Sequence, residues 1–323
     1  MPKRTFIQYL VITAKGLAMG AADVVPGVSG GTIAFISGIY EELIETIHKL
    51  DIGFFKIWKK ESFSNAWKTY NLSFLVALFS GVAISILSLA KVITWLLSNH
   101  SILVWSFFFG LVIASILYVG KQVTKWSIIT GIALIIAAAA AYGITLAEPL
   151  GTADSTWFLF FAGFVAIIAM ILPGISGAFI LLLLGAYTAI IGTISQLGEG
   201  IANMNWQLIS QALIKIGIFA VGAIVGLKVF SRVLNWMFKN HKNLILAVLT
   251  GFMVGALNKI WPWKEVLKYR VNSHGEEVPF IERSIIPTQY PEDPQILYAL
   301  IFMILGFLSI FILERVAVSK NTQ

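Results

Sequence analysis

The stretch GLAMGAADVVPGVSGGTIAFISGIYEELI, residues 16–44, decides the fold. It belongs to an apolar segment, residues 5–44, that proline and glycine interrupt midway in PGVSGG, residues 26–31. A second apolar segment, residues 156–194, is broken in the same way by PGISG at residues 173–177. Proline and glycine end helices, and lipid cannot hydrogen-bond the freed backbone groups, so such a break must be covered by protein or line a watery cavity. Each segment is therefore predicted to form a broken helical hairpin.

Composition excludes several protein classes. Of the 323 residues, 58% are hydrophobic and 12% are charged, whereas soluble domains carry about 25% charged residues. The net charge of +7 comes from basic residues in short stretches between apolar segments, which argues against nucleic acid as a partner. Cysteine is absent, and no HExxH, GxSxG or Walker pattern occurs. We therefore expect a membrane protein that is not an enzyme and holds no metal or cofactor.

Six further segments are apolar over the length of about 20 residues that a membrane span needs. They are residues 71–97, 101–120, 126–147, 206–238, 243–258 and 296–313. With the N-terminus inside, fifteen of the 23 Lys and Arg residues fall in inner segments and five in one outer loop, which predicts that both termini are cytoplasmic. The inner loop 48–70 sets Phe54, Phe55 and Trp58 among lysines, as expected of an amphipathic helix on anionic lipids.

The two halves of the chain resemble each other. A shift of 147 positions lays residues 16–44 on 163–191, and a shift of 141 lays 81–116 on 222–257. The second shift matches Lys91 with Arg232, Trp95 with Trp236, and Asn99-His100 with Asn240-His241. A hairpin plus three spans gives each half an odd number of crossings, so the halves have opposite orientations. The prediction is an all-α polytopic membrane protein of two inverted-topology repeats, residues 1–150 and 151–323. Each repeat contains a re-entrant Pro-Gly-broken hairpin (5–47 and 156–195) and three transmembrane helices, and an outer loop spans 261–295.

The segments after the breaks suit an anion. Ser29 is a good N-cap that leaves the amides of Gly30, Gly31 and Thr32 free, and Ser176 does the same for Gly177 and the two residues after it. Two facing helix starts attract phosphate or carboxylate. The alternative is that the breaks only kink helices and that their glycines permit close packing.

A few charges lie where orientation does not require them. Asp23, three residues before the break, is the leading candidate for a proton or cation carrier, with Glu41 as a second. Alternatively, Asp23 braces the loop by accepting backbone N–H bonds, and Glu41 belongs to a solvated face. Lys91 and Arg232 occupy equivalent positions and suit an anionic headgroup, although snorkelling to the interface explains them equally well. Weaker candidates of the same kind are Lys15, Lys215 and Lys228.

Residues 16–44 also resemble the signature of the PopT family of bacterial polyprenyl-phosphate (undecaprenyl-phosphate) transporters, long catalogued as a domain of unknown function. PGISG resembles the family's second motif. The matching positions are Asp23, Pro26, Gly27, Ser29, Gly30, Gly31, Thr32 and Tyr40, with Pro173, Gly174, Ser176 and Gly177 in the second copy. The resemblance covers the whole chain. It implies return of undecaprenyl phosphate, the C55 carrier lipid of envelope polymers, from the outer to the inner leaflet of the cytoplasmic membrane.

Together these observations give one leading hypothesis and two alternatives. In the leading one, the lipid phosphate sits between the two half-helix starts, with Ser29, Thr32 and Ser176 donating hydrogen bonds and Arg232 or Lys91 balancing its charge. Rocking of the repeats alternates access, and a proton or sodium ion sets direction. The first alternative keeps the fold but carries a small soluble anion with a cation. The second is a membrane-embedded hydrolase of lipid phosphate, which lacks an identifiable nucleophile and base.

Overall fold

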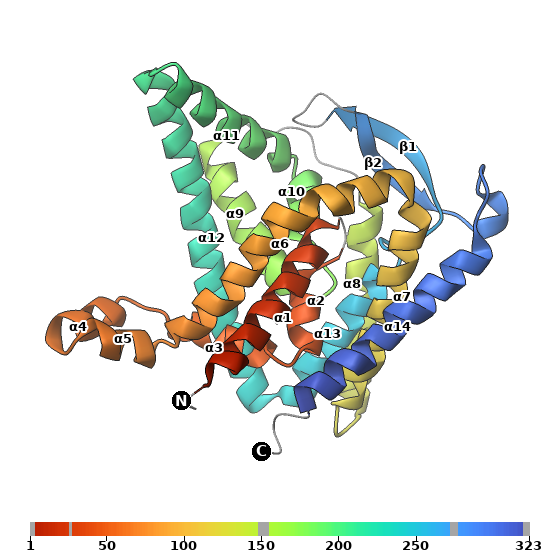
Figure 1. Cartoon of the computed structure of the whole chain (residues 1–323), viewed down its shortest axis with the longest axis horizontal. Coiled ribbons are helices and arrows are strands. Elements are labelled where there is room, and N and C mark those ends of the chain that lie inside the picture. Colours follow the sequence, from red (N-terminus) through yellow and green to blue (C-terminus); the bar gives the residue numbers. More distant parts are fainter. Residues whose placement is uncertain (1–3, 26–27, 148–154, 272–276, 319–323) are drawn as a thin grey trace.

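The chain is a mainly helical multi-pass membrane protein. The computed structural model describes residues 4–25, 28–147, 155–271 and 277–318. The first broken segment forms α1 (Phe6–Val24), α2 (Gly30–Ile36) and α3 (Tyr40–Lys49), and the second forms α9 (Thr156–Ile171), α10 (Gly177–Leu183) and α11 (Ala186–Ala202). Both helix breaks therefore lie where the sequence predicts them. In the view of Figure 1, α1 rises from the lower end and α2 returns beside it, while α9 descends from the upper end and α10 returns.

An ion pair closes the first hairpin. The Arg4 guanidinium, just before α1, lies 2.6 Å from the Glu42 carboxylate in α3. Because the two residues flank the hairpin, α2 must bring the chain back to the end at which α1 begins. The corners of the two hairpins have the same conformation, since Gly38 and Gly185 adopt φ of +73° and +72° at positions that the 147-residue shift relates.

Helices occur at all six predicted spans. They are α6 (Leu72–Asn99), α7 (Ser101–Lys121), α8 (Ile128–Leu146), α12 (Trp206–Asn240), α13 (Lys242–Ala256) and α14 (Ile296–Val318). Within the described ranges, α6, α7, α8 and α12 are long and apolar enough to cross a membrane, and α10 with α11, bent by 104°, makes a fifth candidate. At 15 residues, α13 is about 22 Å long, which is shorter than the predicted full span. At 23 residues, α14 is about 34 Å long.

Glycines pack the first two long helices of each half in the same way. A Cβ atom on Gly16 or Gly81 would collide with the backbone between α1 and α6, and one on Gly163 or Gly222 would collide between α9 and α12. The carbonyl groups that they face belong to Leu78, Thr13, Phe219 and Phe160, respectively. The two shifts relate Leu78 to Phe219 and Thr13 to Phe160, so the equivalence found in sequence extends to individual backbone contacts.

The last helix of each half packs against the other half. In Figure 1, α14 lies along α7, and the glycines Gly110 and Gly306 bring their backbones together. Likewise α8 lies along α13, where Gly251 and Gly255 face carbonyl groups of α8. The two halves are thus interlocked, and the sequence analysis did not predict this exchange.

The turns after α6 and α12 are alike. His100 and His241 have nearly the same backbone angles, φ −139° and ψ 43° against φ −137° and ψ 48°. In each turn the preceding asparagine donates to a tryptophan carbonyl group at 2.8 Å, from Asn99 to Trp95 and from Asn240 to Trp236. The histidines are therefore turn residues here. Figure 1 shows that α6 rises toward its turn whereas α12 descends toward its own.

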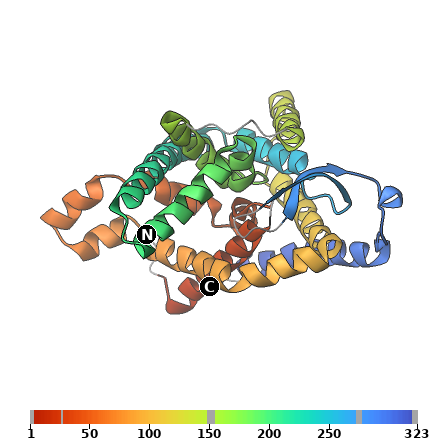
Figure 2. The same cartoon turned by 90° about the horizontal axis from the view of Figure 1, so that it is seen from above.

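The loop that was expected to form one amphipathic helix forms two. These are α4 (Gly53–Lys60) and α5 (Phe63–Thr69), which extend sideways from the body in Figures 1 and 2. Phe54 contacts the rings of Phe55, Trp58, Phe63 and Tyr70 at centroid distances of 5.5–6.3 Å. The rings hold the two short helices together, although Phe55, Trp58 and Phe63 each remain about half exposed.

A β-hairpin covers part of the upper end. Strands β1 (Lys264–Val271) and β2 (Glu277–Ser284) pair antiparallel and lead into the short helix η1 (Pro287–Gln289). Two indole groups fix its base, because Trp261 donates to the Ile285 carbonyl group and Trp263 to that of Pro294, both at 2.8 Å. The sequence analysis assigned no regular structure to this loop, so an all-α description holds for the membrane part only.

Candidate functional site

The half-helix α2 is held at both ends by side chains of α1. The Asp23 carboxylate accepts the Gly30 N–H at 2.7 Å, and the Lys15 ammonium donates to the Ser37 carbonyl group at 2.6 Å. The eight-residue spacing of Lys15 and Asp23 spans about 12 Å along α1, close to the length of the antiparallel seven-residue α2. An acid at a helix start and a base at its end both favour the helix dipole. Asp23 thus makes the bracing contact that the sequence analysis gave as its alternative role.

The other donors at the start of α2 are also engaged. Gly31 donates its N–H to the Ser29 hydroxyl at 3.1 Å, and Thr32 donates to the Ser29 carbonyl group at 2.9 Å. Every residue of α2 is buried. The three amides predicted to meet an external anion therefore bond within the protein, and the Asp23 carboxylate occupies the position of such an anion.

The two helix breaks lie against each other, as expected for the meeting point of the hairpins. The Ser29 hydroxyl donates to the Leu172 carbonyl group at 3.3 Å, and the Gly174 N–H donates to the Thr32 hydroxyl at 3.0 Å. The Tyr40 hydroxyl adds a third bond, to the Ile171 carbonyl group at 3.1 Å. We call this group of three hydrogen bonds the tip contact. Pro26 and Gly27 lie outside the described residues, whereas buried Pro173 precedes Gly174 directly in the second break.

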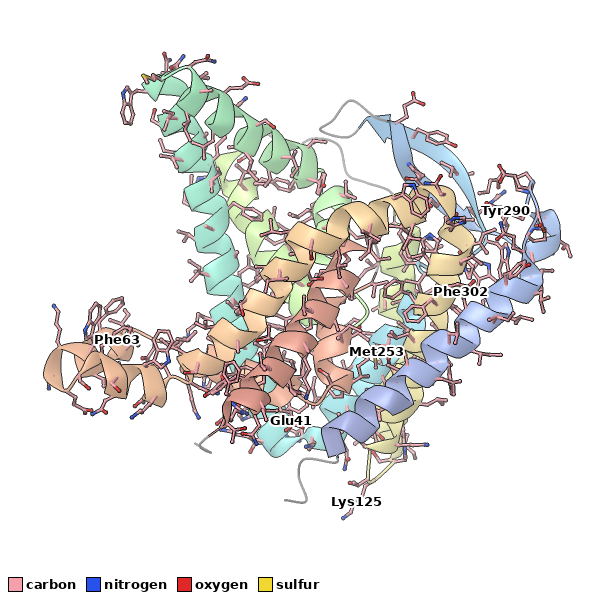
Figure 3. The ribbon with its side chains drawn as sticks, in the orientation of Figure 1. Glu41, Phe63, Lys125, Met253, Tyr290 and Phe302 are labelled. Carbon is pink, nitrogen blue, oxygen red and sulfur yellow. The ribbon has the colours of Figure 1, made fainter. Side chains whose placement is uncertain are left out.

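The approach of the tips is close. A Cβ atom on Gly31 would lie 2.7 Å from the Ile171 carbonyl oxygen, and one on Gly174 would lie 3.0 Å from Met253 in α13. Figure 3 labels Met253 above Glu41 and Lys125 and below Phe302 and Tyr290. The tip contact therefore lies between the two ends of the molecule, where both glycines are needed for the backbones to meet.

The start of the second half-helix, α10, lacks the carboxylate that Asp23 supplies at the start of α2. The Ser176 hydroxyl accepts the Phe179 N–H at 3.5 Å, and the Ser176 carbonyl group accepts the Ile180 N–H at 3.1 Å. The amides of Gly177 and Ala178 have no partner in the part of the chain that the structure describes, and Asp23 has Met170 as its counterpart. Gly177 also packs closely, since a Cβ atom there would lie 2.8 Å from the Ala166 carbonyl oxygen. The two starts that sequence analysis treated as equivalent differ in charge.

A cavity of about 630 Å³ opens at the lower end. Its lining residues are Phe35, Gly38, Tyr40, Glu41, Glu42, Tyr118, Lys121 and Gln122. Tyr40 connects it to the tip contact through its hydroxyl group. Glu41 lies at the rim and forms an ion pair with Lys242 at 2.7 Å, with both side chains half exposed. The cavity thus leads from the lower end toward the tip contact.

The upper end is covered by the hairpin. Glu282 of β2 lies 3.4 Å from the Lys259 ammonium and 3.6 Å from that of Lys264. Lys259 also lies over the ring of Phe179 in α10, and Lys264 lies 3.5 Å from the ring centroid of Trp105 in α7. Burial lowers the pKa of Lys264 to about 8. Burial opposes ionisation of Glu282, but the two ammonium groups hold its pKa below the usual value. We call the cluster of Glu282, Lys259 and Lys264 the upper latch.

Arg232 and Lys228 form no hydrogen bond with the residues of the tip contact. Arg232 is exposed on α12 and forms no ion pair or hydrogen bond with a described residue, and the side chain of Lys91 in α6 lies outside the described part. Lys228 instead caps α3 by donating to the carbonyl groups of Ile47, His48 and Leu50. Within the described ranges, no group of three or more His, Asp or Glu residues could hold a metal ion.

Sequence reasoning underestimated Lys15 and missed Lys264 and Glu282. A usable signal existed for Lys15, because its distance from Asp23 matches the length of the half-helix that the two residues bracket. None existed for the upper latch, which depends on where an inserted hairpin folds back.

Comparison with known proteins identifies the family. A protein-family model described as undecaprenyl phosphate translocase-like matches residues 19–278. The chain belongs to this family. It is 42% identical over 315 residues to a polyprenyl-phosphate transporter of Vibrio cholerae serotype O1, covering 96% of this chain and 98% of the relative. It is 32% identical over 266 residues to a polyprenyl-phosphate transporter of Staphylococcus aureus, covering 77% and 84%, respectively. No solved structure matches the chain.

The region shared with the undecaprenyl phosphate translocase-like family contains every residue of the tip contact, the lower cavity and α12. It ends at residue 278, within β2 and before Glu282.

Proposed function

We propose that this chain is a transporter that returns undecaprenyl phosphate from the outer to the inner leaflet of the bacterial cytoplasmic membrane. The similarity to two polyprenyl-phosphate transporters supports a polyprenyl phosphate as the cargo. The observation that carries the mechanism is the tip contact, a set of direct hydrogen bonds between two broken hairpins. Such a junction is where transporters with broken helices hold their substrates.

The framework is two inverted-topology repeats that rock against each other. The matched glycine contacts and the opposite courses of α6 and α12 support this arrangement. The lower end carries most of the basic residues and is the cytoplasmic end. The lower cavity and the upper latch then correspond to a state open to the cytoplasm and closed to the outside.

The phosphate binds when the tips separate. Ser29 and Thr32, which bond across the tip contact in the present state, become available together with Ser176 and the amide of Gly177. Arg232 or Lys91 balances the charge, while the prenyl tail remains in lipid. The phosphate replaces bonds that the tips make with each other, so binding and separation of the tips are coupled.

Asp23 is the group through which a proton or sodium ion sets direction, with Glu41 as the second candidate. Its carboxylate holds the first residue of α2 through one hydrogen bond to Gly30. Neutralising or coordinating that carboxylate weakens its hold on α2, and α2 carries half of the tip contact. Ion binding at Asp23 therefore changes the stability of the closed tips.

The test is a flipping assay in proteoliposomes that carry undecaprenyl phosphate. Ser29→Ala/Ser176→Ala is expected to lose most flipping, while Ser80→Ala retains it, since the Ser80 hydroxyl donates only within its own helix to Ala77. Full activity of the double variant would show that the tips do not form the anion site. Absence of flipping by the unmodified protein would overturn the function. Uptake of inorganic phosphate with a cation would support a soluble cargo instead, and release of inorganic phosphate from the lipid would support a hydrolase.

A further inference from the structure

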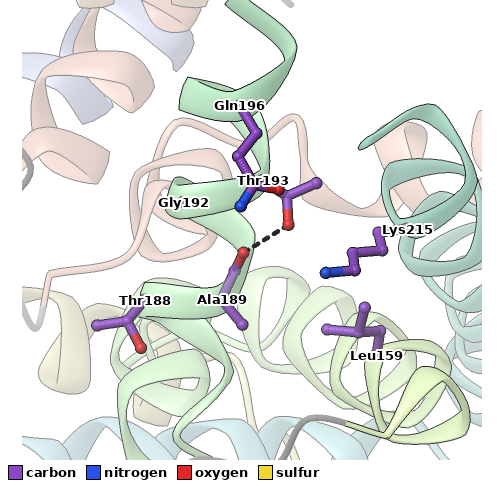
Figure 4. Close-up of a pocket in the computed structure, with 7 residues that line it drawn as sticks. All are labelled: Leu159, Thr188, Ala189, Gly192, Thr193, Gln196 and Lys215. Carbon is purple, nitrogen blue, oxygen red and sulfur yellow. Dashed lines mark hydrogen bonds between the residues drawn. The ribbon is translucent and has the colours of Figure 1, made fainter. Parts of the chain in front are cut away.

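A second cavity, of about 300 Å³, lies between α9, α11 and α12. It is lined by Leu159, Thr188, Ala189, Gly192, Thr193, Gln196 and Lys215. In Figure 4, Lys215 extends from α12 toward α11, where the Thr193 hydroxyl donates to the Ala189 carbonyl group at 2.7 Å. Among the described residues, the Lys215 ammonium has no carboxylate partner and no hydrogen bond. Lys215 is exposed, so its positive charge borders an open cavity, and this part of the chain does not balance that charge.

At the equivalent position in the first repeat, a carboxylate of the chain balances the positive charge. The shifts relate Lys215 to Phe74 and Ala189 to Glu42. In the first repeat a cation also lies at this place, because the Arg4 guanidinium lies over the Phe74 ring at 5.6 Å, and Glu42 pairs with it at 2.6 Å. In the second repeat the cation is retained, but the carboxylate is replaced by the methyl group of Ala189. The part of the chain that the structure describes places no carboxylate within ion-pair distance of Lys215.

The position of Lys215 along α12 fits a lipid headgroup. Lys215 and Lys228 are separated by 13 residues, or about 20 Å, and no charged residue lies between them. Lys228 reaches the end of α3 at the lower side. A hydrocarbon layer about 30 Å thick leaves the two ammonium groups near its opposite edges once their side chains extend outward. Lys215 therefore lies at the depth of the phosphates in the upper leaflet.

We propose that this cavity is the loading site for the phosphate monoester headgroup of a polyprenyl phosphate in the outer leaflet, before it reaches the tip contact. This inference rests on the proposed function. A phosphate monoester carries a charge of about −1.5 to −2, compared with −1 for the phosphodiester of an ordinary phospholipid, so it pairs more strongly with Lys215. The Gln196 amide and the Thr188 hydroxyl supply further donors, and apolar Leu159 borders the site.

The test uses the full-length protein in nanodiscs of neutral phosphatidylcholine, with farnesyl phosphate as a short-chain probe and inorganic phosphate as the soluble comparison. Lys215→Gln is expected to weaken farnesyl phosphate binding by about tenfold or more, as for loss of a charge-assisted contact. Lys239→Gln, an exposed lysine on the same helix, leaves binding unchanged. Ala189→Glu copies the internal partner of the first repeat and is expected to weaken binding to a similar extent, whereas the neutral Ala189→Gln does so by less than about threefold.

Each outcome has a separate meaning. Binding and flipping unchanged in both Lys215→Gln and Ala189→Glu would overturn the loading site while leaving the proposed function intact. Equal affinity for inorganic phosphate and farnesyl phosphate would overturn the lipid headgroup as the ligand. Loss of probe binding in nanodiscs of anionic phosphatidylglycerol would show that ordinary phospholipids fill the cavity, which also contradicts the proposal. Failure of the unmodified protein to flip polyprenyl phosphate would instead refute the proposed function.

Discussion

Replacing Thr32 with valine tests whether the tip contact holds the two halves together. Valine has nearly the shape of threonine but cannot accept a hydrogen bond, so the Gly174 N–H loses its acceptor in a closely packed position. A buried donor without a partner costs about 1–3 kcal/mol. Unfolding entropy of about 2.1 cal/mol/K per residue over 323 residues converts this cost to a Tm decrease of about 2–4 °C.

The measurement is thermal unfolding of purified Thr32→Val in detergent, beside Thr32→Ser, which keeps the hydroxyl group and removes the methyl group. We expect Thr32→Ser to unfold close to the unmodified protein and Thr32→Val to unfold earlier. In the flipping assay Thr32→Val also favours separated tips, so its activity changes while that of Thr32→Ser does not. Equal losses of Tm in the two variants would show that the methyl group, and not the hydrogen bond, is what matters at this position.

Two further predictions concern packing and pH. Gly110→Ala should lower the Tm by several degrees because the added Cβ atom collides with the Met303 carbonyl group. Gly120→Ala should leave the Tm unchanged because Gly120 faces open space. Equal Tm values for the two variants would contradict the packing of α7 on α14. Lys264 has a pKa of about 8 in the folded state and about 10.5 when unfolded, so the folded protein releases this proton first as pH rises. Between pH 8 and 10.5 the free energy of unfolding of the unmodified protein should therefore rise by up to about 3 kcal/mol relative to that of Lys264→Met. The measurement is the difference between the Tm values of the two proteins as a function of pH. A difference that does not change with pH would contradict this reasoning.

The helix breaks and the long helices could be predicted because they depend on local chemistry. Proline and glycine interrupt a helix wherever it lies, and an apolar run of sufficient length requires lipid or a core. The likeness of the halves was also visible, since the two shifts relate Gly16 to Gly163 and Gly81 to Gly222, and the structure places each of these glycines at a helix crossing.

The exchange of α8 and α14 between halves could not be predicted from the sequence. Both helices are apolar on all sides, so their periodicity does not indicate which neighbour each one faces. The β-hairpin was missed for a related reason. Its partly buried positions include the charged residues Lys264 and Glu282, so its strands lack the apolar alternation that normally reveals a strand. Its position depends on Glu282, Lys259 and Lys264, which are distant in sequence from the tryptophan and phenylalanine rings that they meet.

The position of the candidate site could be predicted from the sequence, but the hydrogen bonds that its N–H groups make could not. Sequence analysis expected free amides at both half-helix starts, and the contacts show that Asp23 satisfies one of them from within the chain. A carboxylate seven residues before a helix start reads equally well as an ion carrier or as a cap. The choice depends on whether α2 returns along α1, and the sequence does not determine that geometry.

The charge differences between the two halves affect how tightly each end would bind an anionic cargo. In the first repeat, Asp23 and Lys15 lie at the ends of α2 and Arg4 pairs with Glu42, whereas Lys215 in the second repeat has no partner among the described residues. An anion therefore meets an unbalanced positive charge at the upper end and paired carboxylates at the lower cavity. Such an asymmetry changes how tightly each end binds the cargo, but a fixed charge distribution cannot drive net movement. A ligand shifts an equilibrium only through its differential affinity for the two states. Under the proposed function, net return of the lipid would thus require a second ligand whose concentration differs across the membrane, or removal of the lipid on the cytoplasmic side.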